Sequence, residues 1–309
     1  MIGKVSDSSA ISFVSVNGEI RPYTASGIFT TRVKLQPGDN PFKVVAMDHK
    51  ENLREVFFIV DYTPPVVSLK DRISQNATYY GLIIGIDKYV DDEIQDLDNP
   101  VSDAQKLYQT LSLHYNFQQE HIKFLTDATR GDIIQALDDL ASVVTPNDNL
   151  LIFYAGHGWW DAEASNGYWL PSDADSRVKT NWFRNSTLVD YLKEIDSKHT
   201  LLITDACFGG SIFKMRSAFG NREKAYEKLY ELPSRKAMTS GTLTKVPDRS
   251  SFTRFLIQRL EENEETYLSS EQLFSSFRLA VINNSDAIPQ YGEIENVGDE
   301  GGDFIFLKK

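Results

Sequence analysis

Cysteine is almost absent from this chain: Cys207 is the only one in 309 residues. A single cysteine excludes an internal disulfide and any zinc site built from several thiolates. The five histidines are scattered along the sequence, and no two of them have the spacing of metal ligands. The sequence therefore predicts no structural or catalytic metal and no cofactor.

Long apolar runs and an excess of positive charge are also lacking. No apolar stretch approaches the roughly 20 residues that a helix needs to cross a bilayer, and residues 1–7 lack the apolar segment of a secretory signal. The formal net charge is −12. An acidic surface repels phosphate backbones and anionic lipids and attracts cations. We therefore expect a cytoplasmic protein that binds neither nucleic acid nor membranes and favours cationic substrates.

Residues 1–62 have the pattern of a small all-β sandwich. Asn17-Gly18 is a two-residue hairpin signal, and residues 29–35 alternate with period two before the Pro-Gly-Asp-Asn turn. The hairpin glycine, this turn and a closing strand resemble bacterial immunoglobulin-like modules. Two consecutive prolines then interrupt the pattern, so residues 63–78 are predicted to be a linker.

Residues 79–309 alternate between short apolar runs and helical patterns. Buried-strand runs and amphipathic helical segments follow one another in turn, with Asn99 as a plausible helix cap and Pro100 in the first turn. Such alternation predicts an α/β domain with a mostly parallel sheet covered by helices on both faces.

Two of these apolar runs end at residues able to perform thiol chemistry. Residues 149–155 precede Gly156-His157-Gly158, and residues 200–206 precede Cys207 and a pair of glycines. Parallel strands have their carboxyl ends on one edge, where α/β sheets carry their sites, and adjacent strands lie about 4.8 Å apart. If the two strands are neighbours, the cysteine and the histidine can meet there.

A lone cysteine at a strand end is more often a buried structural residue, so the choice of partner matters. His199 lies eight residues before Cys207, which is about 26 Å along a strand at roughly 3.3 Å per residue. His157 is therefore the candidate base.

The segments around these two residues resemble the two catalytic motifs of caspase-like cysteine peptidases. The motifs are Tyr-Ala-Gly-His-Gly at 154–158 and Asp-Ala-Cys-Phe-Gly-Gly at 205–210. Their His and Cys are 50 residues apart, which agrees with caspase spacing. The resemblance spans residues 79–309 and implies a caspase-like fold. It also implies that Cys207 is the nucleophile, that His157 is the acid and base, and that the backbone N–H groups of Gly158 and Cys207 form the oxyanion hole.

Asp205 stands where caspases, which cleave after aspartate, have glutamine. An acidic residue there is similar to prokaryotic metacaspases and paracaspases, which cleave after Arg or Lys. A partly desolvated carboxylate attracts a cationic side chain and repels an anionic one. The resemblance also implies that Asp103 is a second acidic pocket residue and that Ala155 is a small wall residue. Without it, Asp103 would be read as complementing a helix dipole and Asp205 as making a strand-end hydrogen bond.

Two further segments leave alternatives open. Residues 213–233 are rich in Lys and Arg and resemble the processing loop of a zymogen, but they are equally consistent with a solvated segment of mixed charge. Trp159 and Trp160, directly after the predicted catalytic region, either line a substrate groove or are ordinary loop aromatics. The resemblance leaves calcium dependence open.

We therefore interpret the chain as a cysteine endopeptidase that cleaves proteins or peptides after Arg or Lys. It would be activated by proteolytic processing or by a partner, and the first module would dock a partner or a substrate. The alternative is a catalytically silent caspase-like scaffold or adaptor that binds partners through its β-sandwich.

Overall fold

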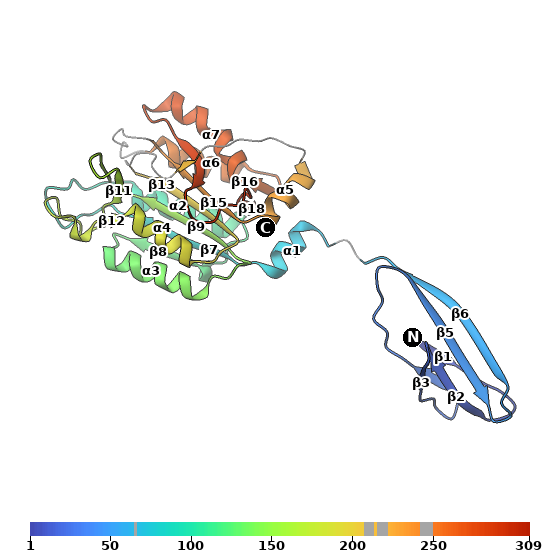
Figure 1. Ribbon diagram of the computed structural model, residues 1–309. Helices are drawn as coiled ribbons and strands as arrows, with labels where there is room; N and C mark the ends of the chain where they lie inside the picture. Colours follow the sequence, from blue (N-terminus) through green and yellow to red (C-terminus); the bar gives the residue numbers. More distant parts are fainter. Residues whose placement is uncertain (65–66, 207–212, 215–221, 242–249) are drawn as a thin grey trace. The chain divides into compact units, whose positions relative to one another are not determined.

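The computed structural model describes residues 1–64, 67–206, 213–214, 222–241 and 250–309, without the side chains of 213–214 and 222–224. The chain divides into two compact units, Met1–Val67 and Ser68–Lys309, each with its own core (Figure 1). Within the described residues, no helix combines the length and apolar character needed to span a membrane.

The first unit consists of two antiparallel sheets. One has four strands in the order β3 (Glu19–Arg21), β2 (Ile11–Val16), β5 (Gly38–Asp48) and β6 (Leu53–Tyr62), and the other pairs β1 (Ile2–Lys4) with β4 (Ile28–Thr30). The predicted hairpin at Asn17-Gly18 joins β2 to β3, and both residues have positive φ, as this turn requires. Val14, Val16, Phe29 and Phe42 form the core between the sheets.

The predicted linker over residues 63–78 is shorter in the structure, because residues 68–78 belong to the second unit. They include helix α1 (Leu69–Asn76), whose N-cap Ser68 accepts a hydrogen bond from the Asp71 N–H at 3.1 Å. Leu69 and Ile73 of this helix are buried in the core of the second unit. Eight residues with two apolar contacts give too little periodicity for the sequence to indicate a helix.

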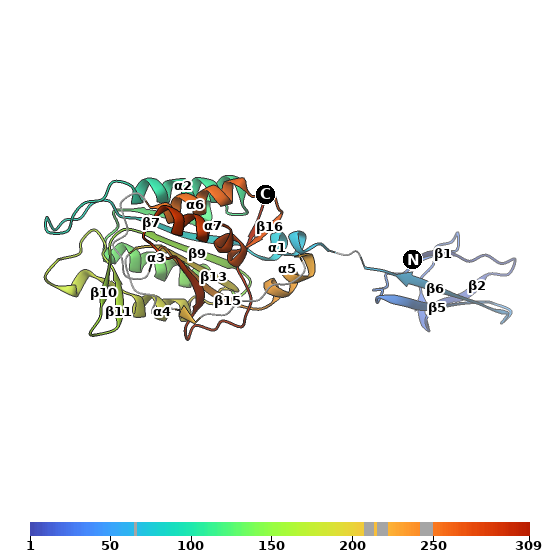
Figure 2. The same cartoon turned by 90° about the horizontal axis from the view of Figure 1, so that it is seen from above.

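The second unit is built on a seven-stranded sheet, which confirms the predicted α/β class (Figures 1 and 2). Five neighbouring strands are parallel, and the two remaining strands at one side form antiparallel pairs. The order is β14 (Phe213–Lys214), β17 (Gln290–Ile294), β15 (Ser234–Thr239), β13 (His199–Asp205), β9 (Asn149–Ala155), β7 (Tyr79–Gly85) and β8 (Ile122–Thr126).

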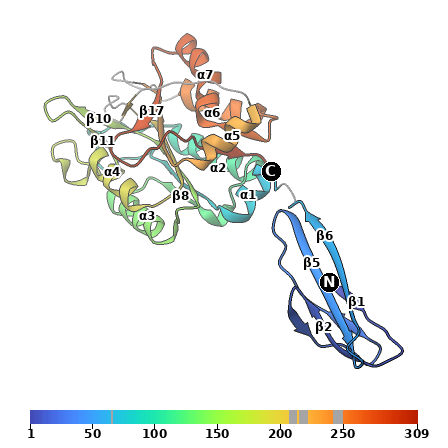
Figure 3. The same cartoon turned by 45° about the vertical axis from the view of Figure 1, so that its right-hand side comes forward.

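Helices cover both faces of this sheet because its strands are apolar on both sides (Figure 3). In β7, Ile83 belongs to one core cluster, while Leu82 and Ile84 belong to the other. The Ile83 face packs against α2 (Pro100–His114), α6 (Ser251–Glu262) and α7 (Ser270–Asn284), and the opposite face packs against α3 (Arg130–Val143) and α4 (Asn185–Glu194).

Shorter elements complete the second unit. A three-stranded antiparallel sheet of β10 (Gly158–Asp161), β11 (Asn166–Trp169) and β12 (Phe183–Arg184) follows β9, and β16 (Tyr267–Ser269) pairs with β18 (Ile305–Leu307). The other elements are helix α5 (Arg222–Glu231) and the 3₁₀ turns η1 (Gln119–His121) and η2 (Lys179–Asn181).

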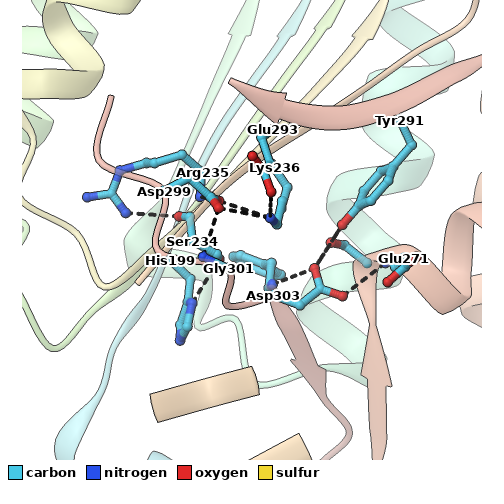
Figure 4. A network of polar contacts seen from close by, with 12 residues as sticks. His199, Ser234, Arg235, Lys236, Glu271, Tyr291, Glu293, Asp299, Gly301 and Asp303 are labelled. Carbon is cyan, nitrogen blue, oxygen red and sulfur yellow. Dashed lines mark hydrogen bonds and ion pairs between the residues drawn. The ribbon is translucent and has the colours of Figure 1, made fainter. Parts of the chain in front are cut away.

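A buried polar network ties the amino end of β15 to the C-terminal segment (Figure 4). Lys236 Nζ lies 3.0 Å from Asp299 and 3.6 Å from Glu293, and the Arg235 N–H donates to Asp299 at 2.7 Å. Asp303 accepts hydrogen bonds from Ser270 and Tyr291. Buried charges of this kind are stable only when paired, so the network fixes the position of β15 within the sheet.

Candidate active site

The two apolar runs that precede His157 and Cys207 are neighbouring parallel strands, as predicted. β9 pairs with β13 in a register that places Ala155 opposite Asp205. His157 and Cys207 therefore each follow the carboxyl end of its strand by two residues. Cys207 itself lies outside the described residues, so the structure gives the position of the histidine and of the strand that leads to the cysteine.

The backbone of His157 is held on both sides by buried tyrosines. Tyr89 Oη accepts a hydrogen bond from the His157 N–H at 2.8 Å, and Tyr154 Oη donates to the His157 carbonyl oxygen at 2.7 Å. The Leu170 N–H also donates to this carbonyl, at 3.0 Å. Three hydrogen bonds to one residue restrict the rotation of its backbone and thereby set the direction of the imidazole.

The imidazole is oriented by a backbone carbonyl. His157 Nε2 lies 2.7 Å from the carbonyl oxygen of Gln95, and the ring packs against Tyr89 with centroids 5.0 Å apart. A carbonyl oxygen can only accept, so Nε2 carries the hydrogen, and Nδ1 is the basic nitrogen of the neutral ring. This orienting group could not be identified from the sequence, because any residue type can present a backbone carbonyl.

Tyr89 and Gln95 belong to the segment between β7 and α2, which carboxylates hold in place. Asp96 accepts a hydrogen bond from the Tyr89 N–H at 3.0 Å and forms an ion pair with Lys88. Asp127, which follows β8, accepts from the N–H groups of residues 87 and 88 at 2.7 and 2.9 Å. The groups that orient His157 are thus fixed from two sides.

Asp205 lies buried at the end of β13. Its carboxylate accepts a hydrogen bond from Thr253 Oγ1 of α6 at 2.5 Å. Burial raises the pKa of Asp205, and the hydroxyl groups of Ser250, Thr253 and Ser240 oppose part of that rise. A buried carboxyl with a raised pKa gains free energy when a cation binds beside it, because the cation stabilises the ionised form.

Asp103 reaches the same edge of the sheet through the close approach of α2. Gly85, which pairs with Ala155, has no Cβ, and an added one would lie 2.7 Å from Val101 Cα and 2.8 Å from the Pro100 carbonyl oxygen. The first turn of α2 therefore rests on the end of β7. The Asp103 side chain is 17% exposed and lies 3.5 Å from Lys106 Nζ.

These contacts bring the predicted pocket residues to one row of the sheet. Gly85, Ala155 and Asp205 are consecutive neighbours across β7, β9 and β13, and Asp103 lies in the helix turn above Gly85. Ala155 and Asp205 share the sheet face that α2 and α6 cover. The row contains the carboxylate of Asp205 and the small side chain of Ala155, and Asp103 adds a second carboxylate on the helix turn.

Comparison with known proteins identifies the family of the second unit. The Caspase domain family model matches residues 79–296, more than two thirds of the chain. The chain belongs to the caspase-domain family.

Metacaspase-1 of Saccharomyces cerevisiae is 34% identical over 85 residues, which cover 25% of this chain and 19% of that protein. Metacaspase-1 of Eremothecium gossypii is 25% identical over 150 residues, which cover 42% of this chain and 31% of that protein. The chain thus spans less than a third of the length of the metacaspases it matches.

The caspase fold itself is seen in a solved structure. Caspase-1 from Spodoptera frugiperda superposes with a TM-score of 0.52 at 12% identity, over 71% of this chain and 87% of that chain. The family match begins at residue 79, so the immunoglobulin-like character of the first unit and the prokaryotic type of the chain stay predictions.

The caspase domain also contains a fully buried histidine, and its surroundings exclude it from the site. His199 is fully buried at the amino end of β13, with Nδ1 2.8 Å from Ser234 Oγ and Nε2 3.0 Å from the Tyr230 carbonyl oxygen (Figure 4). Burial lowers the pKa of His199 to about 3, so the ring is neutral. It supports the sheet at the end opposite to His157.

Other predicted features of the caspase domain are only partly described. Gly158 begins β10 opposite Trp169, but its proposed partner in the oxyanion hole, Cys207, lies outside the described residues. Within the basic stretch over residues 213–233, β14 and the helix α5 are described, whereas residues 215–221 are outside.

Proposed function

We propose that this caspase-domain protein is a cysteine endopeptidase that cleaves after Arg or Lys. The observation that carries the proposal is His157: two tyrosines hold its backbone and a carbonyl orients its Nε2, at the end of the strand beside the one that leads to Cys207. A histidine with this orientation can serve as acid and base for a neighbouring thiol.

The proposed reaction has two steps. The thiol of Cys207 transfers its proton to His157 Nδ1, and the thiolate attacks the scissile carbonyl carbon. The tetrahedral oxyanion accepts hydrogen bonds from the N–H groups of Gly158 and Cys207, and the His157 proton passes to the leaving amine as the C–N bond breaks. A water then hydrolyses the thioester, with His157 as the base, and regenerates the thiol.

Basic specificity is proposed from Asp205 and Asp103. Asp205 belongs to the row of residues beside the end of β9, and Asp103 lies in the helix turn that rests on Gly85. Asp205 is buried with a raised pKa, so a guanidinium or ammonium group would stabilise its ionised form. Residues 68–309 contain 25 basic and 37 acidic residues and thus carry all of the formal net charge. The resulting negative potential attracts cationic segments of substrate proteins.

Activation by processing is part of the proposal, with a narrower location than the sequence alone indicates. Residues 222–231 form α5, and cleavage within a helix requires that helix to unfold first. Lys214 lies in β14, which is paired with β17, so the same argument excludes it, and we place processing at Arg216, between β14 and α5. The first unit, which has its own core, would dock a partner or a substrate, and the site of action would be the cytoplasm.

Fluorogenic peptides with Arg, Lys or Asp at the cleavage position test this function. We expect turnover after Arg and Lys, no turnover after Asp, and none by the Cys207→Ala variant. Intact masses of the same samples should show a processed chain only for the active protein. Turnover after Asp alone would contradict the basic pocket. No turnover of any peptide, even after limited proteolysis, would favour a silent caspase-like scaffold that binds partners through the first unit.

A further inference from the structure

All four tryptophans of the chain lie within 24 residues that begin just after His157: Trp159, Trp160, Trp169 and Trp182. They belong to the small sheet of β10–β12 or directly precede its last strand. Trp169 is buried in the core, stacked on Tyr154 with centroids 4.4 Å apart. The other three line a surface cavity of about 480 Å³.

The strand register distinguishes Trp169, which packs in the core, from Trp159, which lines the cavity. Trp159 pairs with Tyr168, and Tyr168 pairs with Arg184, whereas Trp169 pairs with Phe183. Side chains alternate between the faces of a sheet, so Trp169 and Phe183 share the inner face and Trp159 and Tyr168 the outer one. On this outer face Tyr168 is buried under Lys179 and Arg184, whereas Trp159 is exposed. Trp182 packs against both outward rings, at 5.8 and 5.5 Å between centroids.

Charged side chains also border the cavity, namely Asp161, Glu163, Arg177 and Lys179. Two cationic groups lie over the outer face of the sheet. Lys179 Nζ lies 2.5 Å from Asp161 and over the rings of Tyr168 and Trp182, and the Arg184 guanidinium lies over Tyr168. Trp159, by contrast, is 51% exposed. The cavity therefore presents a large apolar ring to solvent, and apolar side chains gain free energy by covering such a ring.

This cavity continues the predicted catalytic edge. The Leu170 N–H donates to the His157 carbonyl, so the hydrogen-bond ladder between β10 and β11 extends to His157 itself. Two residues of strand span roughly 7 Å, which sets the separation between the His157 and Trp159 backbones. An extended peptide has the same rise per residue, so the cavity lies within reach of a substrate residue two or three positions from the cleaved bond.

We propose that the cavity lined by Trp159, Trp160 and Trp182 is a substrate subsite for an aromatic or large aliphatic side chain. It takes the residue two or three positions from the cleaved bond. This inference rests on the proposed peptidase function, which supplies the substrate peptide. The second determinant of specificity is thus apolar, beside the acidic pocket for Arg or Lys.

The direct test is peptide binding by the full-length Cys207→Ala variant, which does not require turnover. Labelled peptides with a fixed Arg carry Ala, Leu, Phe, Trp or Glu at each of three positions on either side of it. We expect Phe, Trp or Leu at one position to bind about ten-fold tighter than Ala there. Adding Trp159→Ala should reduce this ratio at least five-fold, and the control Leu279→Ala, an exposed apolar side chain of α7 that does not line the cavity, should keep it.

Parallel kinetics with the active protein separate the two proposals. If the aromatic preference in binding is present but no peptide is cleaved, the subsite stands and the peptidase function fails. If peptides are cleaved after Arg without any apolar preference at these positions, the function stands and the subsite is overturned. A preference that persists at full size in Trp159→Ala also overturns it.

Discussion

At the scale of single residues, the site depends on how His157 is held. Its ring direction is set by one carbonyl, that of Gln95, and its backbone by Tyr89 and Tyr154. The proposed reaction therefore depends on these positioning groups as well as on the side chains of His157 and Cys207. Hydrogen bonds from tyrosines to the backbone reduce the freedom of the imidazole before substrate binds, which lowers the entropy cost of reaching the reactive geometry.

Replacing Tyr89 with phenylalanine tests this arrangement. Tyr89→Phe keeps the ring that packs 5.0 Å from the imidazole and removes the oxygen that accepts the His157 N–H. Loss of one buried hydrogen bond costs about 1–1.5 kcal/mol, so we expect kcat for Arg peptides to fall about ten-fold with little change in KM.

Tyr23→Phe is the matched control, since its hydroxyl donates to the Ile11 carbonyl in the first unit. Its kinetics should equal those of the wild type. Full kcat in Tyr89→Phe would show that the tyrosine does not position the histidine, and an equal loss in both variants would point to an unspecific effect.

His199 predicts a specific dependence of stability on pH. Its folded pKa is lowered from 6.5 to about 3, so the unfolded chain binds a proton that the folded chain does not. Stability from this residue is complete above pH 6.5 and is lost as the pH falls towards 3. Between pH 6.5 and about 4.5 we expect a loss of roughly 2–3 kcal/mol, at about 1.4 kcal/mol per unit.

Urea unfolding at several pH values measures this loss. In His199→Gln the loss should be smaller by that amount, whereas His49→Gln, at an exposed position, should follow the wild type. Parallel pH curves for His199→Gln and the wild type would contradict the assignment of a neutral buried ring.

At the scale of elements, the acidic pocket depends on α2 resting on β7. Because Gly85 has no side chain, the Pro100–Val101 backbone can pack against it in space that a Cβ at this position would need. The helix turn that carries Asp103 is thus placed by a glycine on another element. Any group added at Gly85 pushes this turn away from the sheet edge.

Gly85→Ala measures the effect. We expect it to destabilise the protein by about 1–3 kcal/mol, as overpacking does, and to reduce kcat/KM for Arg peptides because Asp103 moves with the turn. Gly131→Ala is the control: it lies exposed in α3, where an added Cβ meets only Thr129 Oγ1 at 3.6 Å. This control should be neutral or slightly stabilising. Wild-type stability and kinetics in Gly85→Ala would contradict the close approach.

The elements that the sequence predicted well are those buried on both sides. β7, β9 and β13 are continuous apolar runs, and the pairing of β9 with β13, which the sequence left conditional, is observed. The period-two pattern over residues 29–35 was less informative, because β4 ends at Thr30. Alternation of apolar and polar residues indicates which side chains are buried. It does not show that the backbone forms hydrogen bonds with another strand.

The site was predicted to the extent that side chains carry its chemistry. His157, Asp205 and Ala155 lie at the expected sheet edge, and His199 is excluded as expected. The Gln95 carbonyl and the Tyr89 hydroxyl could not be predicted, because their roles arise from a loop conformation fixed by Asp96 and Asp127. Such contacts between distant segments have no periodic pattern.

At the scale of the whole molecule, the charge and the proposed chemistry belong to one unit. The first unit has seven basic and seven acidic residues and a separate core, whereas the second has the acidic excess and both faces of the central sheet. The boundary lies before α1, because Leu69 and Ile73 are buried in the second core. The second unit therefore has its own core and contains all of the residues proposed to react.

Two truncated chains test this boundary. Residues 68–309 should cleave short Arg peptides at a rate within about two-fold of the full chain, while residues 79–309 lack α1. Burial of a large aliphatic side chain contributes about 1.5–3 kcal/mol, so loss of Leu69 and Ile73 should lower the free energy of unfolding by about 3–5 kcal/mol. Equal urea midpoints for the two truncated chains would contradict the role of α1.

The most direct measurement for the central claim is covalent trapping by peptide ketones that react with thiolates, one with Arg and one with Asp at the recognition position. Mass spectrometry of the digested protein should show the Arg reagent on Cys207. Labelling should be slower in His157→Ala, which lacks the base, and in Asp205→Asn, which lacks the pocket charge. If the Arg reagent leaves Cys207 unlabelled, or the Asp reagent labels it faster, then the sulfur, the imidazole and the buried carboxylate do not form the site described above.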